Sequence, residues 1–292
     1  MKYLVLLMIV IPFALKGQSS WKKSLSPHNT NIEMFHSSQT ANLPTTETLK
    51  QGNFMYEISH RFESISLGYD GLYGLDGPVS MRTALSYGFT DNLMVSLGRS
   101  NVQDNLDLRL KYKFIQIDAF FSSAIALQAG IAFNTEVFAG LKKRDPFDMN
   151  SVQYYGQAIY NVMFIKNSLG FGIVPSFLYN SFIFTNDYNT DKKYTFSIPF
   201  YLQYYFNRTW SLWVEVNAVA GGWKGNIFYS ADQKNKSHNS LATGAAIETG
   251  GHIFFLFITN SSRLNPSQYL VGANNSFGKD AWRFAFGITR EL

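Results

Sequence analysis

The feature that most constrains the fold is an alternation of apolar and polar side chains that recurs along nearly the whole chain. In residues 105–114, leucine and aromatic residues alternate with Asp107, Arg109, Lys111 and Lys113. Successive side chains of a β-strand point to opposite faces, so this stretch predicts one apolar and one charged face. The same alternation recurs in residues 79–89, 193–206, 209–220 and 281–291.

About twelve such segments follow one another, so the sequence predicts an all-β protein. Counts of ten or fourteen strands stay open, because some segments alternate weakly. Short connections, such as 90–91, 115–117, 207–208 and 250–251, separate longer ones, such as 134–151, 221–239 and 261–280. Outer-membrane barrels have short periplasmic turns and longer external loops. We therefore predict a single antiparallel up-and-down transmembrane β-barrel, with both chain termini on the periplasmic side.

The alternation alone does not say which face of the sheet is inside. A soluble barrel turns its apolar row inward, whereas a membrane barrel turns that row toward lipid. Most predicted strands have about 9–14 residues, enough to cross a bilayer at a tilt, and aromatic residues gather near their ends. We therefore favour the membrane barrel over a soluble secreted β protein. The residues expected to face lipid are Leu106, Leu108, Leu110, Phe196, Ile198, Leu212, Val214 and Phe284.

The first residues have the features of a secretory signal. Lys2 precedes an apolar stretch at residues 3–15, and small and polar residues follow it. The stretch is shorter than the roughly 20 residues of a membrane-spanning helix. We predict a signal peptide at 1–17, a flexible periplasmic leader rich in Ser, Thr and Asn at 18–47, and the barrel at 48–292. The predicted location is the bacterial cell outer membrane.

Charge and cysteine content limit the partners. The formal charge is +5, and loss of Lys2 and Lys16 with the signal would leave +3, too little to predict nucleic-acid binding. The chain has no cysteine, which excludes disulfides, thiolate metal sites and a lipoprotein anchor. The expected partners are outer-membrane lipid and, during biogenesis, the barrel assembly machinery. The sequence does not identify a protein partner, and it predicts no cofactor.

Charged side chains of the inward row are the candidate functional residues. Closure of the barrel makes the last, first and second strands neighbours, which predicts that Arg283, Arg61 and Arg82 cluster near the external mouth. Uncompensated, these cations would favour anions. Paired with Glu57 or a loop carboxylate, they would form a structural network, and both interpretations stay open. The complete set of lumen candidates is Glu57, Arg61, Arg82, Arg109, Lys111, Glu215, Glu248 and Arg283.

Catalysis and metal binding have weaker support. A lipid-hydrolysing barrel needs a serine activated by a histidine on its outer face. His60 lies in the outward row, but its neighbour Ser59 points to the opposite face. Glu248 and His252 flank a predicted glycine turn, and two ligands do not make a zinc site. Residues 187–191 lack the glycine and distal glutamate of an EF-hand loop. We therefore predict no enzyme, no catalytic residue and no metal site.

Three stretches carry a family resemblance: residues 71–78 (GLYGLDGP), 87–100 (YGFTDNLMVSLGRS) and 247–254 (IETGGHIF), together with Thr259–Ser261. They resemble a family of Bacteroidota outer-membrane β-barrels catalogued as a domain of unknown function, over residues 43–292. The resemblance implies export and a single barrel, and it implies no substrate or reaction. Two functions stay open: a small-solute pore or transport-related barrel, and a plugged structural or partner-binding barrel without transport.

Overall fold

The computed structural model describes most of the chain from Met34 onward. The described ranges are 34–117, 120–136, 149, 152–165, 168–181, 193–223, 237–273, 275–278 and 282–292. The predicted signal peptide (1–17) and residues 18–33 of the predicted leader lie outside them. So do residues 187–191.

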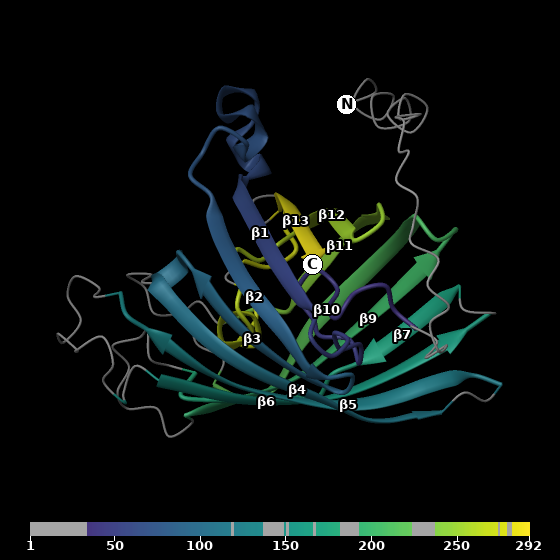
Figure 1. Cartoon of the computed structure of the whole chain (residues 1–292). Helices are drawn as coiled ribbons and strands as arrows, with labels where there is room; N and C mark the ends of the chain where they lie inside the picture. The colour runs from purple at the N-terminus through teal and green to yellow at the C-terminus, as the bar shows by residue number, and fades with distance from the viewer. Residues whose placement is uncertain are drawn as a thin grey trace. The chain divides into compact units, whose positions relative to one another are not determined.

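Thirteen strands among the described residues form one antiparallel sheet, which closes on itself through the pairing of β9 with β10. β7 and β8 each pair with both β6 and β9, so they are two halves of one barrel strand, interrupted at residues 174–175. The barrel therefore has twelve strands, and the predicted fold is confirmed (Figure 1). The strands are β1 (Phe54–Ser64), β2 (Ser80–Thr90), β3 (Leu93–Ser100), β4 (Asn105–Ile117), β5 (Ser122–Asn134), β6 (Val152–Phe164), β7 (Leu169–Ile173), β8 (Ser176–Tyr179), β9 (Tyr194–Tyr205), β10 (Trp210–Gly222), β11 (Ser240–Glu248), β12 (His252–Thr259) and β13 (Arg283–Glu291).

The alternation of residue types is the alternation of the two barrel faces. In β4 the side chains of Leu108 and Leu110 are 46% and 47% exposed, whereas those of Asp107, Arg109 and Lys111 are buried. Exposed apolar side chains on the outside and buried charges inside are the inverse of a soluble barrel. The membrane-barrel orientation of the two faces is therefore the observed one.

The connections sort into two ends of the barrel. The turn at Gly250 and Gly251 lies beside the C-terminus, where the Glu291 backbone N–H donates to the Gly251 carbonyl at 3.0 Å. We call this the short-turn end. At the opposite end, the β1–β2 connection contains the 3-10 helices η1 (Ile65–Leu67) and η2 (Tyr69–Gly74), and the β3–β4 connection contains η3 (Val102–Asp104). The turn predicted at 115–117 is displaced, because β4 continues to Ile117.

Residues 34–49, which we call the N-terminal segment, differ from the expected flexible leader. Most of their side chains are buried, and they contact the inner wall of the barrel at residues as distant as Asn161 and Glu215. The segment forms a tight loop, in which the Thr40 N–H donates to the Leu43 carbonyl and the Thr45 N–H to the Ser38 carbonyl. Figure 1 shows it in purple within the ring of strands. It fills the lumen from the short-turn end.

A second segment fills the lumen from the other end. Residues 260–273, which we call the β12–β13 segment, were expected to form part of an external loop. Instead, nearly all of them are buried, and they include a short helix, α2 (Pro266–Tyr269). Tyr269 belongs to the same buried cluster as Phe35 and Leu43 of the N-terminal segment. The two segments therefore contribute to one buried cluster inside the barrel. Among the described residues, no helix is long and apolar enough to span a bilayer.

Candidate functional site

The wall of the lumen carries a network of four charged side chains from β1, β2 and β4. Arg82 lies between two carboxylates: its Nη1 is 2.8 Å from Glu57 Oε1 and its Nη2 is 3.0 Å from Asp107 Oδ1. Arg109 contacts the same two acids, at 3.4 Å and 3.2 Å. All four side chains are buried. Because the network contains two cations and two anions, its net charge is zero.

Glycine at position 98 allows this network to form across β3. A Cβ atom at Gly98 would overlap the Arg82 guanidinium and the Asp107 carboxylate. Without a side chain at that position, Arg82 of β2 passes β3 and reaches β4. The close approach is the reason why glycine is required there, since any larger residue would separate the two charges.

The three arginines expected near the external mouth do not act together. Arg82 is neutralised by carboxylates, as in the alternative that the sequence left open. Arg61 donates to Ser59 Oγ at 2.8 Å and to the Asn42 side chain of the N-terminal segment, and its guanidinium lies 4.6 Å from the ring centre of Phe257. Arg283 donates to a backbone carbonyl, that of Phe62, at 3.0 Å. An uncompensated cluster of these three cations is therefore not the arrangement found.

Two lysines of β4 bind the N-terminal segment at Ser38, Thr45 and Glu47. Lys111 Nζ donates to the Ser38 carbonyl at 2.6 Å and to the Thr45 carbonyl at 3.1 Å. Lys113 Nζ lies 3.4 Å from Glu47 Oε2. Ser38 and Thr45 face each other across the loop of the segment. A single lysine therefore fastens both sides of that loop to the wall.

Glu215 of β10 binds the same loop at Thr40 and Asn42. Its carboxylate accepts hydrogen bonds from the Thr40 hydroxyl at 2.6 Å and from the Asn42 backbone at 3.3 Å, and also from the Asn42 side chain. On β6, Asn161 Oδ1 accepts from the backbone N–H of Thr46 at 2.8 Å. The segment is thus bound on several sides through polar groups of the wall.

Apolar packing adds to these polar contacts. Phe35 meets Tyr201 edge-on, with ring centres 5.5 Å apart, in a buried cluster that includes Met34 and Leu43. A Cβ atom at Gly170 of β7 would lie 2.6 Å from the Phe35 ring. The wall therefore has no side chain at the point where Phe35 packs.

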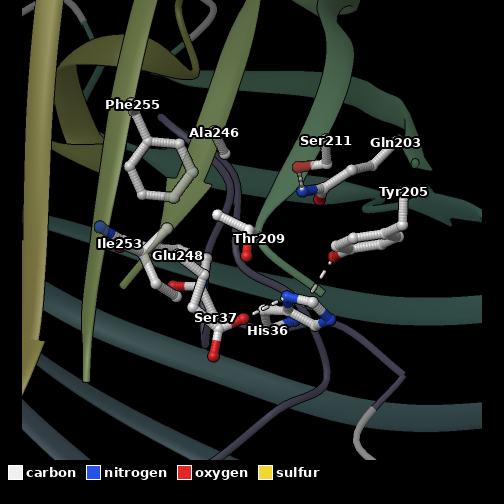
Figure 2. A pocket seen from close by; sticks show the side chains of 11 residues that line it. His36, Ser37, Gln203, Tyr205, Thr209, Ser211, Ala246, Glu248, Ile253 and Phe255 are labelled. Carbon is white, nitrogen blue, oxygen red and sulfur yellow. Dashed lines mark hydrogen bonds and ion pairs between the residues drawn. The ribbon is translucent and has the colours of Figure 1, made fainter. Parts of the chain in front are cut away.

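A small recess lies beside the N-terminal segment at the short-turn end (Figure 2). The His36 imidazole pairs there with the Glu248 carboxylate, and the His36 backbone N–H donates to the Tyr205 hydroxyl at 3.3 Å. Glu248 thus contacts the N-terminal segment. The glycines between Glu248 and His252 both have positive φ, 60° and 104°, as a tight turn requires.

The β12–β13 segment is held mainly by amide groups. The Asn265 side chain accepts from Arg82 Nε and donates to Asn105, and Gln268 Nε2 donates to the Val102 carbonyl at 2.8 Å. Asn217 of β10 donates to the Tyr269 carbonyl at 2.6 Å. These contacts lie toward the end of the barrel opposite the short turns.

Burial also affects the one arginine of the β12–β13 segment. Arg263 is 1% exposed. Desolvation, and secondarily repulsion from the Arg283 guanidinium, lowers the pKa of Arg263 to about 9.

Several lumen residues have no counterpart among the sequence candidates. Asp107 and Lys113 lie in the same inward row as Arg109 and Lys111, so the alternation of β4 was sufficient to find them. The two filling segments were harder to recognise. Apolar residues such as Phe35 and Leu270, placed in regions expected to be a leader and an external loop, were the available signal.

The outward histidine and Ser59 lie on opposite faces of β1. The Nε2 atom of His60 is buried and lacks a hydrogen-bond partner there. The Ser59 hydroxyl lies on the inner face, where it accepts from Arg61. No group of three or more His, Cys, Asp or Glu side chains suited to a metal ion occurs within the described ranges.

Solved structures that resemble this chain are outer-membrane barrels of low sequence identity. The outer membrane channel COG4313 from Pseudomonas putida F1 has a TM-score of 0.52 and 12% identity, over 85% of this chain and 98% of the other. The NanC porin has a TM-score of 0.48 and 13% identity, over 82% and 100% of the two chains. At 12% identity, the similarity to the COG4313 channel supports the fold alone. A search of curated protein sequences finds no match.

A family model also matches the sequence. The model describes a membrane bound beta barrel domain, DUF5777, and it matches residues 35–292. That range includes almost all of the N-terminal segment as well as the barrel. Barrels with an exposed apolar belt and a polar interior are proteins of bacterial outer membranes. The chain therefore belongs to this family of membrane-bound β-barrels and is an outer-membrane protein.

Proposed function

We propose that this protein is a gated channel for small solutes, with the N-terminal segment as its gate, and that it is not an enzyme. The observation that carries the proposal is the nature of the filling. A wall lined with charged and polar side chains is closed at the short-turn end by the chain's own N-terminal segment. An inner wall of this chemistry suits water and polar solutes when the segment is displaced.

The polar contacts of the N-terminal segment are of a kind that water or a solute can replace. Hydrogen bonds in proteins contribute about 0.5–1.5 kcal/mol each, because the separated groups bond to water instead. Within the described residues, the segment continues into the wall only on its C-terminal side, through residues 50–53. There the Gln51 N–H donates to the Asp91 carboxylate at 2.9 Å, and the Gly52 N–H to the Gly88 carbonyl at 2.9 Å. This attachment forms a natural hinge at the rim.

The similarity to solved channels is compatible with this proposal. COG4313 from Pseudomonas putida F1 is described as an outer membrane channel, and its barrel is the same general fold. The charged wall and the displaceable segment are the specific support in this chain.

The alternative is a permanently plugged barrel that serves as a scaffold or binds a partner. The observation in its favour is that two segments, rather than one, fill the lumen, and that large side chains such as Arg82, Tyr201 and Tyr269 are almost fully buried. Such a protein would carry no current in any state of its N-terminal segment. Conductance therefore separates the two functions.

Engineered disulfides provide the test, because the natural chain has no cysteine. The pair Thr46→Cys and Asn161→Cys joins the N-terminal segment to β6, where the two side chains are 3.0 Å apart. In planar bilayers, the oxidised protein should be silent, and reduction should restore openings. The matched pair Asn105→Cys and Asn265→Cys ties down the β12–β13 segment and should leave the current unchanged. Absence of current in the wild type and in both reduced proteins would establish the plugged alternative.

A further inference from the structure

We propose that the solutes that pass this barrel are small anions, and that the N-terminal segment closes the lumen by occupying positions where the anions bind. This inference rests on the proposed channel function and names its substrate class. The atoms of the segment that meet the cations of the wall are the main observation.

Three cationic side chains of the wall contact the N-terminal segment, and each of them meets an oxygen atom. Lys111 Nζ contacts the carbonyl oxygens of Ser38 and Thr45. Lys113 contacts a carboxylate oxygen of Glu47 at 3.4 Å. Arg61 contacts the amide oxygen of Asn42. Carbonyl and carboxylate oxygens are the same acceptors that a carboxylate or phosphate solute presents to lysine and arginine.

The net charge of the inner wall also favours anions. Among the described strand residues, the buried charged side chains comprise five cations and three acids. Arg82 and Arg109 are paired with Glu57 and Asp107. The cations outside that network are Arg61, Lys111 and Lys113, and the acid outside it is Glu215. With the N-terminal segment removed, the wall therefore carries a net positive charge.

The segment compensates this charge while it is in place. In the part of the chain that the structure describes, no carboxylate of the wall lies within ion-pair distance of Lys111 or Lys113, and Glu47 of the segment is the acid beside Lys113. Leaving a buried charge without its partner is strongly destabilising. An anion that enters as the segment leaves would supply the missing oxygens, so anions would favour the open state by binding it preferentially.

The cations also lie in an order suited to passage. Lys113 and Lys111 are two residues apart on one face of β4, which places them about 6–7 Å apart along the strand. Because β4 runs toward the short-turn end, Lys113 is the first of them that a solute from that end would meet. Arg61 lies near the far end of β1. An anion would pass from one cation to the next, as conduction through several weak sites requires.

The test separates release of the gate from selectivity. Asn161→Ala removes an uncharged contact of the N-terminal segment and leaves the charge of the wall unchanged. Lys111→Gln with Lys113→Gln loosens the same segment and removes two positive charges. Both full-length variants are placed in planar bilayers, and the reversal potential is measured in a gradient of potassium chloride and then of potassium phosphate. Resistance of the folded band to SDS before heating verifies that each barrel is folded.

We expect both variants to open more often than the wild type. Asn161→Ala should be anion-selective, and the lysine variant should lose at least about tenfold in its ratio of anion to potassium permeability. Phosphate added at the short-turn side should raise the open probability of the wild type. Equal selectivity of the two variants, or a cation-selective Asn161→Ala, would overturn the anion inference while leaving the channel intact. If neither folded variant conducts, the channel function itself fails. If the lysine variant does not fold, the selectivity of Asn161→Ala and the phosphate response of the wild type still decide the matter.

Discussion

The two segments that fill the lumen differ in how they are held. The N-terminal segment is bound by charged groups of the wall: Lys111 binds it at Ser38 and Glu215 binds it at Thr40. The β12–β13 segment is bound mainly by amides, such as those of Asn265 and Gln268, and it continues into a barrel strand at each end. Among the described residues, the N-terminal segment continues into a barrel strand only at its C-terminal end.

This difference assigns different roles to the two segments. A segment anchored at both ends loses less conformational freedom on docking, because the fixed ends of the connection already restrict it. A segment anchored at one end gains much freedom on release, and its charged contacts respond to ions that enter the lumen. We therefore expect the β12–β13 segment to be a fixed constriction and the N-terminal segment to be the movable part. Hydrogen exchange of the two segments measures this directly.

The largest effect should come from the network that underlies the β12–β13 segment. Asp107→Asn removes a fully buried carboxylate that pairs with Arg82 and Arg109. Breaking a buried ion pair by removing one partner costs about 3–5 kcal/mol. The free energy of unfolding, measured with guanidinium chloride in detergent micelles, should fall by that order.

A matched control for this change is Ser96→Ala, which removes a buried but uncharged contact with Ser86, at 2.7 Å. Its cost should be about 0.5–1.5 kcal/mol. Because Arg82 also donates to Asn265, Asp107→Asn should increase exchange in residues 260–273 more than in residues 34–49. Equal destabilisation by the two substitutions would show that the charges of the network contribute little.

A methyl group at Gly170 should release the N-terminal segment alone. The added Cβ atom would lie 2.6 Å from the Phe35 ring, and overpacking of this kind costs about 1–3 kcal/mol. Gly170→Ala should therefore accelerate hydrogen exchange in residues 34–49 and leave residues 260–273 unchanged. Gly156→Ala is the control, since a Cβ atom there meets nothing within 4 Å. Faster exchange in both segments after Gly170→Ala would mean that they move as one unit.

A substitution at Asn265 should loosen the β12–β13 segment alone. Asn265→Ala leaves a buried donor of Arg82 unsatisfied, at a cost of about 1–3 kcal/mol. Exchange should become faster in residues 260–273, and exchange in residues 34–49 should stay as in the wild type. Ser276→Ala, at an exposed position of the same connection, should change neither. A response confined to residues 34–49 would reverse the roles assigned to the two segments.

The smallest effect is expected at the rim of the short-turn end. His36 and Glu248 are 28% and 26% exposed, and ion pairs near the surface contribute about 0–1 kcal/mol. His36→Ala should therefore change exchange in residues 34–49 only slightly, and less than Gly170→Ala does. An effect as large as that of Gly170→Ala would show that this ion pair is one of the main contacts that hold the N-terminal segment in the lumen.

The barrel could be predicted because its signal is local and repeated. In β4, the alternation of leucines with Asp107, Arg109 and Lys111 reports the two faces without knowledge of any other strand. Twelve such strands, with connections that alternate in length, define an up-and-down barrel. The inward placement of Arg109, Lys111 and Glu215 follows from the same period, because adjacent residues of a strand cannot share a face.

The contents of the lumen could not be predicted in this way. Thr46 meets Asn161 and Thr40 meets Glu215, contacts that span 115 and 175 residues, and residues 34–49 have no period that would indicate a partner. Their composition, rich in serine, threonine and asparagine, is that of a free leader. It is equally suited to a polar lumen, where hydroxyl and amide groups bond to charged side chains.

The sequence by itself determined the outward face and the row of inward charges, because each depends on side chains within a few residues of one another. The alternating lengths of the connections indicated the strand order. Only the tertiary structure decided which of those charges neutralise each other and which hold the N-terminal segment. Arg82 is paired with Glu57 and Asp107, whereas Lys111 is paired with backbone carbonyls of residues some 70 positions away. The physical reason is that ion pairing falls off steeply with distance, and only closure of the barrel sets those distances.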